Sequence, residues 1–206
     1  EEALKVAEVE VSEPVEGMVW VAGSVKGPLA ELSVQGKLVA RNARYGEISL
    51  WDLAGPVRFD GDKLAAGPLR GHMEGFGFEA SAEVRGLRGG KPVVVAQARS
   101  EPARLESIRQ LAEMRVPVAG QVRLERSAVE VKDRKIARLE AEVSVSGLQV
   151  GAERVGDMKL VARGTGEQVR IEPVRVRLGG GRAELAAVIG LDGRSGEASV
   201  RLEECE

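Results

Sequence analysis

Apolar and polar residues alternate along most of this chain. Residues 139–146 read LEAEVSVS, so that Leu, Ala and Val take every second position and Glu or Ser the positions between. The same alternation runs through 34–41, 174–178 and 197–202. Successive side chains of a β-strand point to opposite faces of a sheet. Each of these segments is therefore predicted to form a strand with one apolar and one polar face.

Short turn-forming sequences separate the predicted strands. They include Gly27-Pro28, Asp60-Gly61-Asp62, Gly89-Gly90, Gly164-Thr165-Gly166 and Asp192-Gly193. The intervals between them suit hairpins, because a parallel βαβ unit needs a crossover of about a dozen residues or more. The chain is therefore predicted to be all-β, with antiparallel or mixed pairing. Four prolines, Pro14, Pro68, Pro117 and Pro173, are expected near strand starts, which disfavours free sheet edges.

One segment has a helical pattern instead. Residues 102–114 read PARLESIRQLAEM, and Leu105, Ile108, Leu111 and Ala112 fall at helical spacing between charged residues. Ser100 is a suitable N-cap, and Pro102 fits the first turn. The segment predicts one short amphipathic helix that closes an end or edge of the sheet.

The second half of the chain repeats the pattern of the first. With an offset of 105 residues (139 − 34), Val34 aligns with Leu139, Leu50 with Val155 and Leu64 with Val169. Upstream the offset slips, so that Pro14 meets Pro117. We therefore divide the chain into a first unit over 14–116 and a continuous second unit over 117–206. Residues 1–13 are expected to be the tail of a preceding unit, which suggests a piece of a longer protein.

Composition narrows the choice of architecture. Aromatic residues make up only 3% of the chain, while Gly accounts for 26 of 206 residues. A closed β-sandwich, which commonly fills its core with aromatics, stays open as an alternative. A long, twisted, U-shaped sheet with an apolar groove inside is the better fit. The net charge of −2 argues against a nucleic-acid partner.

No combination of residues indicates catalysis or metal binding. The chain has one cysteine, Cys205, and one histidine, His72, which are too few for a Cys/His metal site. Gly179-Gly180-Gly181 precedes an alternating strand rather than a helix, so it does not predict a phosphate loop. Asp60-Gly61-Asp62 lacks the rest of a calcium loop. We therefore expect no enzymatic activity, no metal and no cofactor.

Several segments resemble a known family. They are Gly23-Ser24-Val25-Lys26-Gly27-Pro28-Leu29, the stretch 38–46 that ends in Tyr45-Gly46, and Leu178-Gly179-Gly180-Gly181-Arg182 followed by an Ala-rich strand. In this order they resemble the repeating region of the TamB and AsmA-like family of bacterial envelope proteins. The resemblance implies a taco-shaped β-groove in the periplasm, within a parent protein held in the inner membrane by an anchor outside this chain. It also implies movement of phospholipid toward the outer membrane, and an Omp85-type partner contacted by other parts of that parent.

The resemblance gives the inward-facing apolar residues a role. Without it, an ordinary packed core would be the better interpretation of these side chains. With it, they are predicted to line a groove for phospholipid acyl chains, because short apolar side chains leave room for a ligand. The predicted groove residues are Val34, Leu38, Leu50, Leu64, Leu69, Phe78, Leu139, Val143, Val155, Val169, Val176, Leu178, Leu185 and Ile189. A chaperone-like module that assists outer-membrane protein assembly by strand addition is the alternative function.

Overall fold

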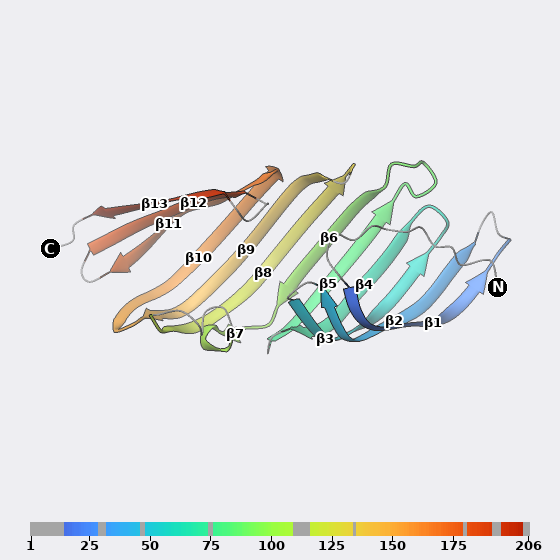
Figure 1. Ribbon diagram of the computed structural model, residues 1–206, viewed down its shortest axis with the longest axis horizontal. Coiled ribbons are helices and arrows are strands. Elements are labelled where there is room, and N and C mark those ends of the chain that lie inside the picture. The colour runs from blue at the N-terminus through green and yellow to red at the C-terminus, as the bar shows by residue number, and fades with distance from the viewer. Residues whose placement is uncertain are drawn as a thin grey trace.

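The protein is one open antiparallel sheet (Figure 1). The computed structural model describes residues 15–28, 32–45, 48–73, 76–108, 116–133, 135–178, 181–190 and 195–203. Its 13 strands follow one another across the sheet in chain order, except that the short strand β7 pairs with β8 beside the main path. All pairings among the described strands are antiparallel, and no described element forms a second sheet. The predicted all-β, elongated sheet is therefore confirmed.

The strands are long for a globular protein. Their bounds are β1 Val15–Lys26, β2 Ser33–Tyr45, β3 Ile48–Phe59, β4 Leu64–Met73, β5 Phe76–Arg85, β6 Val93–Ser100, β7 Ala103–Arg104, β8 Val118–Lys132, β9 Lys135–Val150, β10 Glu153–Gly166, β11 Gln168–Leu178, β12 Gly181–Gly190 and β13 Gly196–Glu203. The predicted turn at Asp60-Gly61-Asp62 joins β3 to β4, and the Lys63 amide donates to Asp60 Oδ1 at 3.0 Å.

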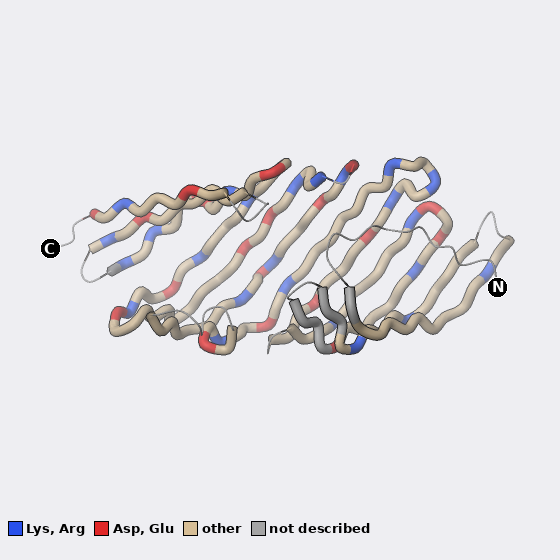
Figure 2. Tube along the Cα trace, viewed as in Figure 1, with Lys and Arg blue, Asp and Glu red and all other residues tan. Residues whose placement is uncertain are grey.

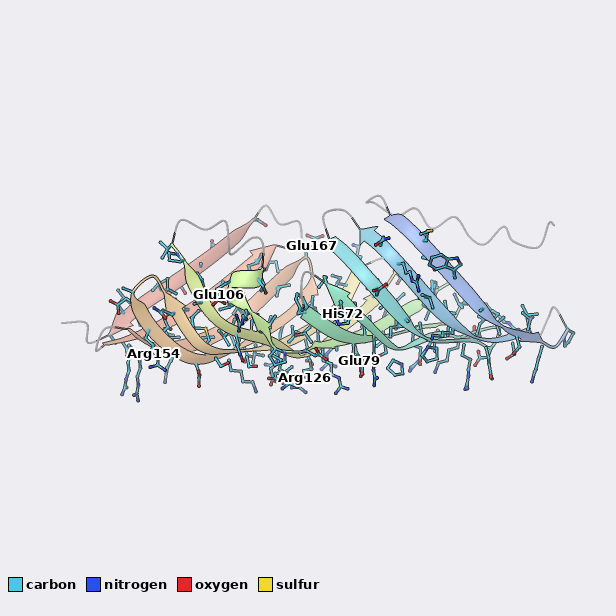
Figure 3. All side chains as sticks on the ribbon, turned by 90° about the horizontal axis from the view of Figure 1, so that it is seen from below. His72, Glu79, Glu106, Arg126, Arg154 and Glu167 are labelled. Atoms are coloured by element: carbon cyan, nitrogen blue, oxygen red, sulfur yellow. The ribbon has the colours of Figure 1, made fainter. Side chains whose placement is uncertain are left out.

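The alternating pattern places apolar and polar residues on opposite faces of this sheet. Residues directly opposite each other on neighbouring strands point to the same side. One such row joins Leu124, Val143 and Leu160 across β8, β9 and β10. The sheet curves along its length, and Glu79, Arg126 and Arg154 lie on its outer side (Figure 3). The apolar rows therefore occupy the inner side of the curve.

The helix predicted over 102–114 is wrong for its described part. Ala103 and Arg104 form β7, which pairs with Val122 and Gln121 of β8. A single 3₁₀ turn, η2 (Leu105–Ser107), follows, and Ile108 is extended. Residues 109–114 lie outside the described residues. Leu105 is only 6% exposed, so burial beside β8 decides the backbone here in place of the helical spacing.

Strand positions repeat along the chain. β5 covers 76–85 and β12 covers 181–190, which are 105 residues apart (181 − 76). Pro68 in β4 and Pro173 in β11 both lie at register shifts, between Ala66 and Leu69 and between Ile171 and Val174. The two prolines were expected near strand starts, yet they lie inside strands. A bulge accommodates them, because proline cannot donate a hydrogen bond to the ladder.

The buried core is thin. Its described apolar members are Ala40, Leu69, Ala103, Leu105, Val145, Val174, Val176 and Ala183, and no polar side chain joins them. Most other apolar side chains on the inner face are only half-buried. A sandwich would bury such a face under a second sheet. Here the inner face stays open along most of the described strands.

Candidate functional site

The predicted groove residues with described side chains all lie on the inner face. Leu69 and Val176 are buried, whereas Leu64 and Ile189 are 37% and 43% exposed. The half-buried members are Val34, Leu38, Phe78, Leu139, Val143, Val155, Val169 and Leu185. The side chains of Leu50 and Leu178 lie outside the described residues, although their backbones belong to β3 and β11.

The register joins these residues into continuous apolar rows. Val34 is opposite Val25 and Phe59, and Leu139 is opposite Val129 and Gly164. Further along, Val169 is opposite Ile189. The groove is therefore one surface that crosses the sheet rather than a set of separate pockets.

A cavity of about 370 Å³ forms the most apolar part of the groove. It lies on the inner face beside Ala103 of β7 and Ile108, between β4–β6 and β8–β9. Its lining includes Met73, Phe76, Phe78, Ile108, Leu124 and Val143, and only Arg99 and Ser100 contribute polar groups. Ligand sites of this kind commonly enclose about 300–1,000 Å³. Because almost all of the lining surface is apolar, the cavity can hold an apolar chain without burying unpaired polar groups.

A second apolar cluster lies toward the C-terminal end of the sheet. Val174, Val176 and Ala183 are its buried members, at 6%, 5% and 1% exposure. Val155, Met158, Leu160 and Leu185 pack against them. This cluster is the floor of the groove over β10, β11 and β12.

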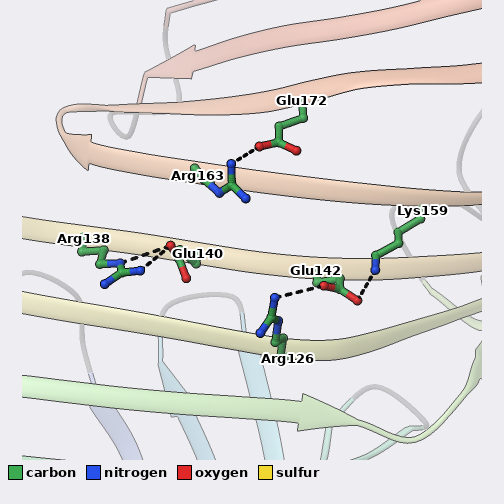
Figure 4. A network of polar contacts seen from close by, with 7 residues as sticks. All are labelled: Arg126, Arg138, Glu140, Glu142, Lys159, Arg163 and Glu172. Carbon is green, nitrogen blue, oxygen red and sulfur yellow. Dashed lines mark hydrogen bonds and ion pairs between the residues drawn. The ribbon is translucent and has the colours of Figure 1, made fainter.

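Basic and acidic residues are interleaved along the described strands (Figure 2). Glu142 forms ion pairs with Lys159 at 2.6 Å and with Arg126 at 3.4 Å. Arg163 pairs with Glu172 (Figure 4). The Lys159 hydrogen bond, with help from Arg126, lowers the pKa of Glu142 below its ordinary value. The neighbouring guanidinium of Arg138 likewise lowers the pKa of Glu140. Because ionised carboxylates favour contact with water, these groups keep the outer face hydrated.

A concavity of about 950 Å³ opens on the outer face. Lys37, Arg41, Asp52, Arg70 and Glu79 are among its lining residues. Arg70 and Arg99 both pair with Glu79, at 3.4 and 2.7 Å, so much of its charge is already compensated. Its lining mixes polar with apolar surface, whereas the lining of the inner cavity is almost entirely apolar. The inner groove is therefore the better candidate site.

Sequence reasoning missed the segment that covers the groove. Ala103, 7% exposed, and Ile108 line one side of the cavity. The helical spacing of Leu105 and Ile108 concealed the position of this segment. Leu124 and Phe76 were also missed, although both follow the same alternation as the predicted residues. Within the described ranges, no group of three or more His, Cys, Asp or Glu side chains is placed to hold a metal ion.

Comparisons with known proteins add no relative. The chain matches no family model, no curated protein and no solved structure. The described part of the chain contains no helix with the length and hydrophobicity to cross a membrane. The resemblance to TamB and AsmA-like proteins therefore stays a prediction from the sequence.

Proposed function

We propose that this chain is a segment of a lipid-transfer conduit in the bacterial cell envelope. Phospholipid acyl chains lie against the inner face of the sheet, while the headgroups stay in water at its rim. The periplasm is the proposed location, and the route runs between the inner and outer membranes. The movement is passive, so it needs no catalytic group and no cofactor.

One observation carries this proposal. Most described side chains on the inner face are apolar, from β1 to β13, and no second layer of described strands lies over them. An acyl chain is recognised by apolar contact alone, and each buried methylene contributes about 0.8 kcal/mol. Over β9 to β12 the outer face is charged and its charges are paired, so that part of the face offers no such surface.

Binding should depend on acyl length. We expect the chain to bind fluorescent NBD-phosphatidylethanolamine supplied from vesicles of phosphatidylethanolamine and phosphatidylglycerol. Competing fatty acids should gain up to about fourfold in affinity for each added methylene that is buried. Fluorescence displacement measures both effects. Competition by glycerophosphoethanolamine, a headgroup without acyl chains, or the absence of any binding would contradict the proposal.

The chaperone-like alternative is favoured by a different feature. β1 has one edge without a described partner strand, and no charged residue lies between Gly17 and Val25. Such an edge can accept an extended peptide by strand addition. Binding of unfolded outer-membrane strands in place of lipid would support this function.

A further inference from the structure

Among the described strands, β1 lies at one end of the sheet. β1 pairs with β2 on one side, and no other described strand lies on the second side. Val19, Val21 and Val25 on its inner face are 57–62% exposed. Met18 and Trp20 on its outer face are 54% and 46% exposed. Proteins usually guard such edges with charge, proline or a bulge.

The opposite end of the sheet is similar. β13 pairs only with β12 among the described strands, and every residue of β13 is exposed. Val200 and Leu202 continue the apolar rows of the inner face, yet each is 61% exposed. The rows are therefore interrupted at both ends of the sheet rather than completed.

The internal repeat identifies what fits these two edges. Val200 lies opposite Leu185 just as Ala98 lies opposite Ala80, and these partners are 105 residues apart (185 − 80). β13 is therefore the counterpart of β6. Val25 lies opposite Val34 as Val129 lies opposite Leu139, so β1 is the counterpart of β8.

The counterparts already pair with each other inside this chain. β6 and β8 run antiparallel, with Val95 opposite Glu130, Ala96 opposite Val129 and Ala98 opposite Ser127. The two free edges are thus the two halves of an interface that the same chain forms at its centre. A second copy of the chain would present one half to the other.

We propose that copies of this chain associate head to tail, with β13 of one copy pairing antiparallel with β1 of the next in the register of β6 and β8. Transferring that register places Ala198 opposite Val25 on the inner face. It places Glu197 opposite Lys26 on the outer face, where opposite charges pair. Val200 then faces Gly23, whose missing side chain leaves room for it.

This head-to-tail contact forms an open row of copies rather than a closed dimer. Each copy uses two different edges, so every added copy leaves one edge free at each end. The inner apolar rows and the outer charged rows both continue across the junction. Association therefore lengthens the groove, and the inference does not depend on what the groove binds.

A charge exchange at the edges tests the proposed register. Analytical ultracentrifugation of the wild-type chain should show an average mass that rises with concentration beyond that of a dimer. Lys26→Glu places like charges opposite each other and should weaken association by up to about fivefold. Combining it with Glu197→Lys should restore the wild-type behaviour. A monomer at all concentrations, as expected if residues 1–14 cover β1, would overturn the proposal.

Cysteine crosslinking tests the register of β13 with β1 even where the copies associate weakly. In a Cys205→Ser background, copies carrying Val25→Cys are mixed with copies carrying Ala198→Cys. Residues directly opposite on neighbouring strands bring their Cβ atoms within about 4.5–5.5 Å, close to the spacing of a disulfide. We expect these copies to crosslink faster than a mixture of Val25→Cys with Val200→Cys. Oligomers that form without this preference would overturn the register and with it the proposal.

Discussion

Val143→Asp is expected to lower phospholipid binding by about tenfold or more, because it places a carboxylate where acyl chains lie. Val143 lines the apolar cavity and lies opposite Leu124 and Leu160. An ionised group at this position keeps its water and excludes the methylenes beside it. Displacement of NBD-phosphatidylethanolamine measures the loss.

The matched control is Ser146→Asp on the same strand. Ser146 is exposed and lies on the outer face, opposite Gln121. The variant receives the same charge three residues further along β9, on the opposite face, and phospholipid binding should stay unchanged. Circular dichroism melts of both variants establish that the sheet is intact. An equal loss in both variants, or no loss in a folded Val143→Asp chain, would count against the groove as the binding site.

Gly71→Ala is expected to destabilise the fold by about 1–3 kcal/mol through overpacking. A Cβ atom at Gly71 would lie 2.4 Å from the carbonyl oxygen of Asp52 and 2.9 Å from the ring of Phe78. Backbone atoms cannot move aside without disturbing the β3–β4 ladder. Urea unfolding should report a lower midpoint with an unchanged slope.

Gly89→Ala provides the comparison for this prediction. Gly89 lies in the turn between β5 and β6, and its added Cβ would meet only the carbonyl oxygen of Gly86, at 3.7 Å. We expect its unfolding midpoint to match the wild type closely. Similar midpoints for all three proteins would mean that the inner face relaxes around Gly71, and the close packing of β3 against β4 would have to be abandoned.

The alternation of residues was sufficient to predict the sheet and its faces. Val143 and Val145 against Ser144 and Ser146 set the phase of β9 without any tertiary information. The phase holds because every strand has the same two environments, apolar inside and wet outside. For the same reason the candidate groove residues could be chosen from sequence, although their role as a lipid path remains a proposal.

Tertiary contacts decided the features that the sequence pattern did not predict. Leu105 and Ile108 have helical spacing, yet Leu105 is buried in a 3₁₀ turn beside β8 and Ile108 is extended and lines the cavity. Pro68 and Pro173 read as strand boundaries, because a proline within a ladder needs a bulge that the sequence does not reveal. The apolar cavity also escaped prediction, since it depends on the tertiary positions of Ala103 and Ile108.

The pairing of the two sheet ends could not be inferred from alternation alone. Offsets between equivalent residues differ from strand to strand, so the register of β6 with β8 had to be known first. Only then do Lys26 and Glu197 come opposite each other. The internal repeat therefore predicts which strands correspond, and the bulges determine which residues meet.

Paired photo-crosslinking tests the central proposal most directly. A photoreactive amino acid is placed at Val143 or at Ser146, and the folded chain is irradiated with vesicles of phosphatidylethanolamine and phosphatidylglycerol. We predict phospholipid adducts at position 143 and none at position 146 by mass spectrometry. Equal labelling at both positions, or no lipid adduct at position 143 in a folded chain, would contradict the proposed acyl-chain groove.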